Sequence, residues 1–490
     1  LKILFVSSEV FPFAKTGGLA DVSGALPKTM KKLGHEVRII MPKYKVVNER
    51  KFVLREVIRL KDIPILLGSD TKKISVKSAF TTDTEKIQTY FIDYKPYFGR
   101  DGLYVDTKSK KEYVDNDERF ILFAKGIFET LKLLFWQPDI IHCNDWQTGL
   151  VPFFLRTLYK DDDFFKKTAA LFTIHNVGYQ GNFPAGSYVK TNIDSDLFTP
   201  GAHTEFYGKF SFMKTGIYYA DFVNTVSPTY AKEVQETEEY GFGFEGIFSD
   251  RKKYFSGILN GVDYCVWDPE TDALIPQNYS IRGLSAKVEN KKALLEQYGL
   301  PFKENVPLIG VISRLSDQKG FDLIEEIKEA LFDLDVQLVL LGTGEKKYHK
   351  MFQKLAKKYP EKVGVNLTFD NELAHRIEAG SDMFLMPSRY EPCGLNQMFS
   401  LKYGTVPVVR KTGGLADTIH EFDPETGKGN GFIFNDYDSR ELLNAIKRAL
   451  KIYKDQKSWT RIMKNGMKQD FSWMAAAKKY YKLYEKILKR

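Results

Sequence analysis

Charged and hydrogen-bonding side chains stand directly after short apolar runs at several places in this chain. They are Lys15, Asp21, His142, Asp145, His175 and Asn176 in the first half, and Arg314, Lys319, Glu391 and Cys393 in the second. Lysine and arginine bind phosphate through charge-assisted hydrogen bonds, and a carboxylate or imidazole can orient a polar substrate. Each residue alone is more often structural. Cations, carboxylates and imidazoles occur repeatedly at the ends of these apolar runs. Together they predict a site for a small anionic ligand.

The apolar runs are typical of buried β-strands. They lie at 2–9, 36–42, 139–145, 168–175 and 221–227, and then at 307–314, 336–344, 382–388 and 406–411. β-branched and apolar runs that alternate with helical patterns indicate parallel sheets covered on both faces. Such sheets bind ligands beyond the carboxyl ends of their strands. We therefore expect the polar side chains to lie at edges that face a crevice between the two halves.

A helix is predicted directly after the first run. Its apolar positions are Leu19, Val22, Leu26, Met30 and Leu33. The three- and four-residue steps are those of one helix face, and Gly34 ends the pattern. Pro27 falls inside it and predicts a kink.

The motif KTGGLAD occurs twice, at 15–21 and at 411–417. In both copies two glycines precede a predicted helix. Glycines let backbone N–H groups approach a ligand closely, and a helix start favours anions. We expect anion binding more strongly at the first copy than at the second, and the alternative for either is a tight turn that binds nothing.

The length of 490 residues implies at least two domains. The strand series breaks around 228–300, and we place the boundary after residue 255. The predicted fold is α/β, with two Rossmann-like doubly wound domains at 1–255 and 256–471. The tail from about 472 to 490 is a basic amphipathic helix.

The composition limits the class of protein. With 43% hydrophobic and 28% charged residues, the chain reads as an ordinary soluble protein. The net charge of 72 − 63 = +9 is spread out, which does not indicate nucleic-acid binding. No apolar run approaches the roughly 20 residues of a membrane helix. Three scattered cysteines favour a reducing compartment, so we expect a cytoplasmic location.

Several familiar sites are missing from the sequence. The loop after the first run lacks the G-x-G-x-x-G of dinucleotide-binding proteins, and neither a phosphate loop G-x-x-x-x-G-K-[ST] nor a G-x-S-x-G elbow occurs. D-x-D pairs, which can hold a metal diphosphate, begin at Asp115, Asp194, Asp333 and Asp436. Because they are scattered, we interpret them as chance and predict no metal site.

Six motifs resemble one known family, the bacterial glycogen synthases and plant starch synthases. They are KTGGLADV (15–22), IHCNDWQTG (141–149), IHNVGYQG (174–181), NGVD (260–263), SRLSDQKG (313–320) and SRYEPCGLNQMFSLKYG (388–404). The resemblance runs along the whole chain and is closest to the bacterial type that uses ADP-glucose. It implies the two-domain GT-B fold, two lobes facing across a cleft, with the last helix crossing back onto the first domain. The implied reaction moves glucose from ADP-glucose to the non-reducing end of an α-1,4-glucan such as glycogen, with retention and without a metal or other cofactor.

The resemblance also implies roles for single residues. Arg314 and Lys319 would hold the donor diphosphate, and Glu391 would orient the transferred glucose. The remaining assignments are Lys15 with Gly17, Gly18 and Asp21 for the donor, His175 and Asp145 for the glucose or acceptor, Asn260 for the transferred sugar, Tyr390 for the nucleobase, and Cys393, Gly394 and Leu395 for the glucose subsite.

The chain departs from many related retaining transferases at one position. They carry a second glutamate eight residues after the first, where this chain has Phe399. The resemblance therefore does not imply two carboxylates on that loop. Two alternatives stay open: a retaining transferase of the same fold with UDP-glucose or another acceptor, and a glycan-binding protein without activity.

Overall fold

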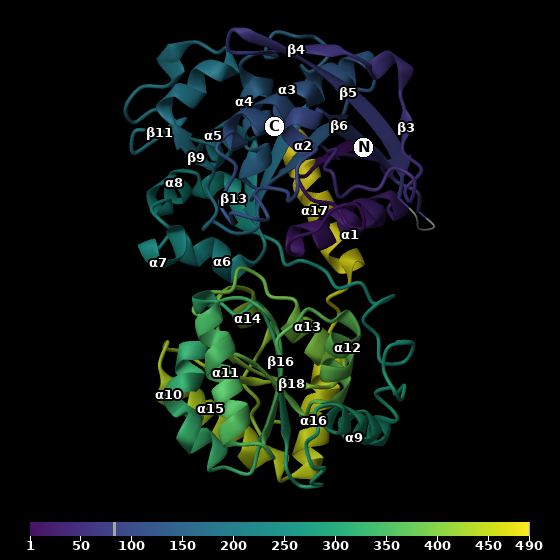
Figure 1. Ribbon diagram of the computed structural model, residues 1–490, viewed down its shortest axis with the longest axis vertical. Helices are drawn as coiled ribbons and strands as arrows, with labels where there is room; N and C mark the ends of the chain where they lie inside the picture. Colours follow the sequence, from purple (N-terminus) through teal and green to yellow (C-terminus); the bar gives the residue numbers. More distant parts are fainter. Residues whose placement is uncertain (82–84, 490) are drawn as a thin grey trace. The chain divides into compact units, whose positions relative to one another are not determined.

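Our computed structural model describes residues 1–81 and 85–489, and the chain forms two compact units (Figure 1). Unit 1 comprises Leu1–Val226, Ala231–Gly261 and Trp473–Arg490, and unit 2 comprises Ser227–Tyr230 and Val262–Ser472. The chain thus leaves unit 1 after Gly261, where the sequence led us to expect a boundary after residue 255.

Unit 1 contains a ten-stranded sheet with the order β13-β12-β8-β7-β1-β2-β6-β5-β3, in which β4 pairs with β5. The parallel strands are β1 (Lys2–Val6), β2 (Glu36–Pro42), β6 (Gln88–Asp93), β7 (Ile140–Asn144), β8 (Ala169–Ile174), β12 (Phe222–Thr225) and β13 (Phe255–Gly257). The antiparallel ones are β3 (Arg55–Glu56), β4 (Ile63–Leu67) and β5 (Asp70–Phe80). A small antiparallel sheet adds β9 (Asn182–Pro184), β10 (Glu205–Phe206) and β11 (Lys209–Ser211).

The helices before residue 261 are mostly short. They are α1 (Gly18–Lys32), α2 (Lys95–Phe98), α3 (Asn116–Leu133), α4 (Leu150–Arg156), α5 (Phe212–Tyr219), α6 (Pro228–Glu233), α7 (Glu238–Gly241) and α8 (Glu245–Asp250). The predicted helix after the first strand is confirmed as α1, which contains Pro27. Gly34 follows it with φ of 90°, a left-handed conformation that suits glycine and ends a helix.

The last helix, α17 (Trp473–Leu488), belongs to unit 1, where it packs on α1 (yellow and purple in Figure 1). Its Tyr484 hydroxyl lies 2.7 Å from His142 Nδ1, and His142 Nε2 lies 2.6 Å from the Thr173 hydroxyl. Both ring nitrogens of this fully buried histidine are therefore used inside the unit. His142, which we grouped with the ligand-site candidates on the basis of the sequence, instead connects α17 to the sheet through these two hydrogen bonds.

Unit 2 contains a six-stranded parallel sheet with the order β16-β15-β14-β17-β18-β19. Its strands are β14 (Leu308–Ile312), β15 (Gln337–Leu341), β16 (Val363–Asn366), β17 (Met383–Met386), β18 (Val406–Arg410) and β19 (Phe432–Phe434). Its helices are α9 (Lys287–Gln297), α10 (Phe321–Phe332), α11 (Lys346–Lys358), α12 (Asn371–Gly380), α13 (Asn396–Lys402), α14 (Gly413–Thr418), α15 (Ser439–Tyr453) and α16 (Gln456–Met467).

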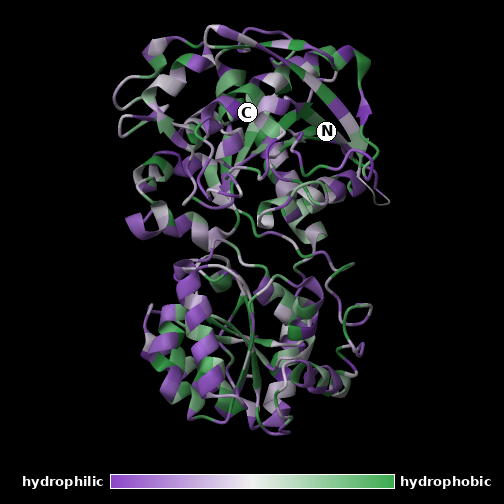
Figure 2. Cartoon of the chain, in the orientation of Figure 1, coloured by the Kyte–Doolittle hydropathy of each residue, from purple (hydrophilic) through white to green (hydrophobic). Residues whose placement is uncertain are grey.

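Each unit buries its parallel strands between helices, and in Figure 2 the central strands are mainly in the apolar colour while the helices carry both colours. Leu4, Ile40, Ile141 and Leu340 are fully buried. Continuous burial of this kind is what apolar strands covered on both faces require. The predicted class, two doubly wound α/β units, is confirmed. Among the helices of residues 1–81 and 85–489, none combines the length and the apolarity needed to cross a bilayer.

Candidate active site

Among the parallel strands of each large sheet, the strand order reverses once. Lys15, Asp145, Arg314, Lys319 and Glu391 follow the strands at these two reversals, and His175 follows β8, which pairs with β7. In unit 2 the reversal lies between β14 and β17, and in unit 1 it lies between β1 and β7. A crevice opens at the carboxyl ends of the strands at such a switch point and is the usual ligand site of an open α/β sheet. The fold therefore selects two strand ends in each unit.

In unit 2 the loops after β14 and β17 are joined by a buried ion pair. Lys319 Nζ lies 2.5 Å from Glu391 Oε2, and the Ser388 hydroxyl donates to the same oxygen at 3.1 Å. Only 8% of the Glu391 side chain and 20% of the Lys319 side chain are exposed. A carboxylate this buried needs such a partner, and its orientation is fixed by two donors.

Arg314 stands beside this pair in the chain but is bound much more loosely. Its side chain is exposed, and its one described hydrogen bond is a 3.5 Å contact from Nη2 to the Gln318 amide oxygen. A guanidinium offers five N–H donors in a flat fork that suits phosphate. Most of the donors of Arg314 are thus available to a ligand.

Close backbone packing fixes the two loops. Gly320 has φ of 72°, and a Cβ there would lie 1.9 Å from the Pro387 carbonyl oxygen. The Asn396 amide donates to the Ile312 carbonyl at 2.8 Å, and the Gln318 amide donates to the Tyr390 carbonyl at 3.2 Å. The positions of Lys319 and Glu391 therefore depend on contacts between loops far apart in sequence.

In unit 1, Lys15 follows β1 and pairs with Asp21 on α1. Lys15 Nζ lies 2.6 Å from Asp21 Oδ1 and 2.8 Å from Oδ2, and both side chains are more than one-third exposed. An exposed pair of this kind contributes little to stability. The ammonium group is therefore free to exchange this partner for a ligand at small cost.

The loop that carries Lys15 is held by Glu9, a residue that was not among the candidates predicted from the sequence. The backbone N–H groups of Thr16 and Gly17 and the Thr16 hydroxyl donate to the Glu9 carboxylate, which is 4% exposed. The Tyr104 hydroxyl also donates to it, at 2.8 Å. These two backbone N–H groups, which we expected to face an anionic ligand, are taken by a carboxylate of the chain itself. Glu9 follows β1, so the strand-end rule used for Lys15 also selects it.

Gly17 and Gly18 border open space. A Cβ at either position would meet no atom within 4 Å. Gly17 has the extended backbone φ of −153°, which any residue adopts. Neither packing nor backbone conformation explains the glycine at 17, so the free space beside the loop is the notable feature.

At the end of β7, Asp145 adopts a strained backbone with φ of 56° and ψ of 176°. Its Oδ1 accepts the His175 backbone N–H at 2.7 Å, and the His175 Nε2 lies 3.0 Å from Asn144 Oδ1. Burial raises the pKa of Asp145 to about 7, and burial lowers the pKa of His175 to about 3. His175 is therefore a neutral imidazole near pH 7, a hydrogen-bonding group and not a cation.

The comparisons with known proteins show the family of this chain. Residues 2–250 match the family described as starch synthase catalytic domain, and residues 295–466 match the glycosyl transferases group 1. Glycogen synthase of Thermosipho africanus is 49% identical over all of both chains, and that of Desulforudis audaxviator is 47% identical over 100% of this chain and 97% of its own. This chain belongs to the glycogen synthase family. It is a glycosyltransferase, as we expected.

Solved structures place this glycogen synthase family member in the GT-B fold. The catalytic domain of starch synthase IV from Arabidopsis thaliana, bound to ADP and acarbose, aligns with a TM-score of 0.89 and 33% identity over the full length of both chains. Sucrose-phosphate synthase of Thermosynechococcus elongatus aligns with a TM-score of 0.59 over 99% of this chain and 98% of its own. At 17% identity, the second alignment shows the fold alone.

The second KTGGLAD copy of the glycosyltransferase is not open like the first. It begins α14, but a Cβ on Gly413 would lie 2.0 Å from the Glu391 carbonyl oxygen, and one on Gly414 would lie 2.0 Å from that of Cys393. The Gly414 N–H donates to the Glu391 carbonyl at 3.1 Å. These glycines pack against the Glu391 loop, so the space that we expected an anion to use is filled by backbone.

The residues after Glu391 are held from α13. The Gln397 amide donates to the carbonyls of Cys393 at 3.0 Å and Gly394 at 3.1 Å, and Gly394 has φ of 68°. The Cys393 side chain is buried, and Leu395 precedes α13 directly. Cys393, Gly394 and Leu395 thus form a fixed turn beside Glu391, while the Tyr390 carbonyl is bound by Gln318.

Phe399, where related transferases have a second glutamate, stacks on Trp267 with ring centroids 4.0 Å apart and planes at 4°. Trp267 in turn stacks on His375 at 3.8 Å. A carboxylate at 399 would lose this aromatic contact. The structure therefore gives Phe399 a packing role in this glycosyltransferase.

Asn260 lies near the end of the segment Ala231–Gly261 of unit 1. It is 8% exposed, and its Oδ1 has no hydrogen-bond partner among the described residues. A buried amide oxygen without a donor costs free energy, which a ligand hydroxyl would recover.

Across residues 1–81 and 85–489, no three His, Cys, Asp or Glu side chains form a group that could hold a metal.

Proposed function

We propose that this chain transfers glucose from ADP-glucose to the non-reducing end of an α-1,4-glucan, with retention of configuration and without a metal ion. The observation that carries the proposal is the Lys319–Glu391 pair, 2.5 Å apart beside the exposed Arg314, at the strand reversal of unit 2. This arrangement provides two cations for a departing diphosphate and one fixed carboxylate for a sugar.

The cations stabilise the negative charge that develops on the leaving diphosphate. As the bond between glucose and phosphate breaks, charge builds on the phosphate oxygens and the sugar takes on oxocarbenium character. Arg314 and Lys319 would each contribute roughly 1.5–3 kcal/mol through charged hydrogen bonds. Only the part that is stronger in the transition state accelerates the reaction. We assign Lys15, with the open space at Gly17 and Gly18, to the phosphorylated donor as well.

Glu391 is proposed to orient the glucose that is transferred. Its carboxylate is already bound by Lys319 and Ser388, so its remaining acceptor sites have fixed directions and are available to sugar hydroxyls in this proposal. A rigid acceptor costs no reorganisation when the sugar binds. The fixed turn at Cys393, Gly394 and Leu395 would line the same subsite.

Neutral groups of unit 1 are proposed to bind the sugar or the glucan. Asn144 Nδ2 donates to the carbonyls of Val6 and His142, so Asn144 Oδ1 accepts from His175 Nε2–H. His175 Nδ1 then carries a lone pair that accepts a sugar hydroxyl. Asn260 offers a second buried acceptor, and Asp145 fixes the backbone of His175.

Two comparisons support the choice of donor and acceptor. The relatives that align over the full chain are named glycogen synthase, and the starch synthase IV structure contains ADP and acarbose. We carry ADP over as the nucleotide part of the donor and a glucan as the acceptor.

The proposal is tested by a transfer assay to glycogen with ADP-glucose and with UDP-glucose, each with and without EDTA. We expect turnover with ADP-glucose to exceed that with UDP-glucose at least tenfold and to be unchanged by EDTA. The new linkage is expected to be α, as shown by NMR of the product. Preference for UDP-glucose, loss of activity with EDTA, or a β linkage would each contradict the corresponding part of the proposal.

A further inference from the structure

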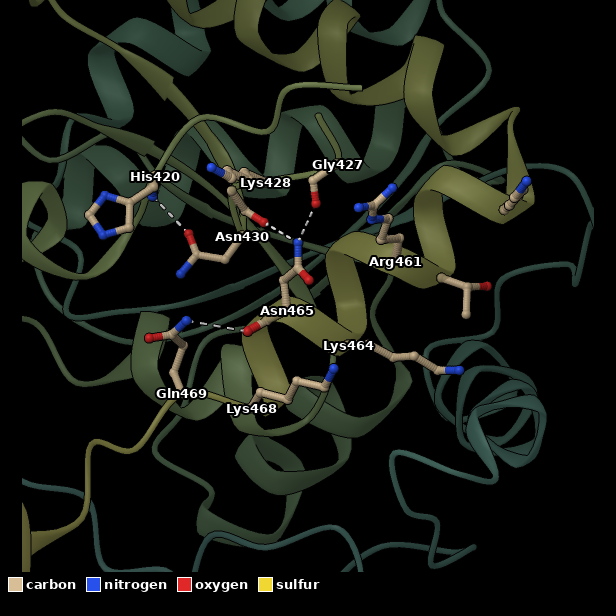
Figure 3. Close-up of a pocket in the computed structure, with 12 residues that line it drawn as sticks. His420, Gly427, Lys428, Asn430, Arg461, Lys464, Asn465, Lys468 and Gln469 are labelled. Atoms are coloured by element: carbon tan, nitrogen blue, oxygen red, sulfur yellow. Dashed lines mark hydrogen bonds between the residues drawn. The ribbon is translucent and has the colours of Figure 1, made fainter. Parts of the chain in front are cut away.

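A basic pocket lies in unit 2 between α16 and the loop 427–430, and the proposed glucose transfer does not use it (Figure 3). It has a volume of about 840 Å³. Five of its twelve lining residues are lysine or arginine and none is acidic; the five are Lys428, Lys457, Arg461, Lys464 and Lys468. A pocket of this volume accommodates a metabolite, and its charge selects an anion.

The ammonium groups of this basic pocket form no ion pair within the described part of the chain, although the Asp455 carboxylate interacts electrostatically with Lys457. Lys428, Lys457, Lys464 and Lys468 are exposed, and within residues 1–81 and 85–489 their ammonium groups have no hydrogen bond or ion pair. The carboxylate of Asp455, on the same helix end, accepts the N–H groups of Lys457 and Ser458. Holding several like charges together is unfavourable, and a multiply charged anion removes that cost.

The wall of the basic pocket is rigid. The Asn465 amide donates to the carbonyls of Gly427 at 2.9 Å and Gly429 at 2.8 Å, as Figure 3 shows for Gly427. Arg461 donates to the Thr426 carbonyl at 3.0 Å, and a Cβ on Gly427 would lie 1.9 Å from the Arg461 guanidinium carbon. The loop and the guanidinium are therefore positioned before any ligand arrives, which favours binding.

Hydrogen bonds connect the same wall to the Glu391 loop. The Asn430 amide donates to the Thr418 carbonyl at 2.9 Å, at the end of α14. The Gln397 amide donates to the Thr418 hydroxyl at 3.3 Å and to the Cys393 carbonyl at 3.0 Å. A ligand bound at the loop 427–430 is therefore connected by hydrogen bonds to groups that hold the turn after Glu391.

We propose that the basic pocket is a second anion site that binds a small, multiply charged phosphate compound and changes the rate of glucose transfer. The clustered ammonium and guanidinium groups recognise the phosphate groups of such a compound. A sugar phosphate and a nucleotide share these groups, and inorganic tripolyphosphate presents them without a sugar or a base.

The binding test is isothermal titration calorimetry at low salt with tripolyphosphate, glucose 6-phosphate and ATP as separate probes. The pocket variant is Lys464→Glu with Lys468→Glu. The control is Lys447→Glu with Lys451→Glu, which makes the same charge change at the same spacing on the exposed face of α15. We expect the pocket variant to bind one tripolyphosphate fewer than the wild type and the control to bind the wild-type number.

If all three proteins bound the same number of tripolyphosphate ions, or if the control lost one as the pocket variant does, the proposed site would be contradicted. The outcome is independent of the proposed function, because it counts a difference in bound anions and needs no turnover. The two organic probes then distinguish the sources: a sugar phosphate site loses one glucose 6-phosphate in the pocket variant, and a nucleotide site loses one ATP.

The effect on activity is measured at limiting ADP-glucose with the probe that binds best. We expect the probe to change the rate of the wild type and of the control at least twofold more than that of the pocket variant. Any competition at the donor site affects all three proteins alike, so it cancels in this comparison. Equal responses in the three proteins would overturn the coupling between the basic pocket and the Glu391 loop.

Discussion

The Glu391 carboxylate is bound by the ammonium group of Lys319 and the hydroxyl of Ser388. Its role in catalysis is tested by a substitution that removes the negative charge and keeps the size of the side chain. We expect Glu391→Gln to lower kcat by at least 10³-fold, since a neutral amide neither forms an ion pair with Lys319 nor stabilises a developing positive charge on the sugar as a carboxylate does. Steady-state transfer from ADP-glucose to glycogen measures this. Glu329→Gln is the matched control, because Glu329 also pairs with a lysine, at 2.9 Å from Lys358, but both side chains are more than half exposed. Wild-type turnover in Glu391→Gln would remove Glu391 from the site.

The low pKa of His175 predicts that the contribution of this residue to the stability of unit 1 falls in acid. Burial lowers the pKa to about 3 from an ordinary value of 6.5, so the unfolded chain binds a proton near pH 6 that the folded chain does not. The stability contributed by neutral His175 is present above pH 6.5 and falls as the pH decreases, by about 2 kcal/mol at pH 5. Asp145, with its raised pKa of about 7, acts in the opposite direction and is present in both proteins, so the test is the difference between them. From pH 7 to pH 5, we expect the unfolding temperature of His175→Gln to change less unfavourably than that of the wild type. An equal change in both proteins would contradict the lowered pKa of His175 in the folded state.

Single residues were predictable where position in the sheet decides them. Lys15, Arg314 and Glu391 follow strands, and apolar runs identify strands in a sequence. The pairing of Lys319 with Glu391 was not predictable from the motif at either position, because it depends on how two loops pack. The same applies to His142, which follows the pattern of the site residues but is bound by Tyr484 from the last helix.

The two KTGGLAD copies show that one heptapeptide serves two purposes in two elements. Gly414→Ala places a Cβ 2.0 Å from the Cys393 carbonyl oxygen, whereas Gly17→Ala places it in open space. We expect Gly414→Ala to lower the unfolding temperature of unit 2 by several degrees, corresponding to roughly 1–3 kcal/mol. Gly17→Ala is expected to keep the unfolding temperature and to raise the KM for ADP-glucose.

Calorimetry and donor kinetics on the two glycine variants separate these effects. If Gly17→Ala destabilised the protein and left the KM unchanged, the open space would have no part in binding. If Gly414→Ala were as stable as the wild type, the claim that Gly414 packs closely against the backbone of the Glu391 loop would be contradicted.

At the scale of elements, the long apolar strands and α1 were predictable, and the mixed edge of the unit 1 sheet was not predicted. β4 (Ile63–Leu67) alternates buried and exposed side chains, as a half-exposed antiparallel strand does. Continuous apolar runs, in contrast, identify only strands that are buried on both faces. Alternation along 63–67 is the signal that identifies β4.

At the scale of the molecule, the family was predictable because its motifs are spread along the whole chain. The loops of unit 2 that carry Arg314, Lys319 and Glu391 meet at one strand reversal, although 72 residues separate Lys319 from Glu391. The central claim is that this strand reversal binds the donor diphosphate.

The most direct measurement is a crystal structure of the protein with ADP bound. The account predicts both phosphates within hydrogen-bonding distance of the Arg314 and Lys319 side chains, with Lys319 still next to Glu391. A diphosphate bound away from Arg314 and Lys319 would contradict the central claim.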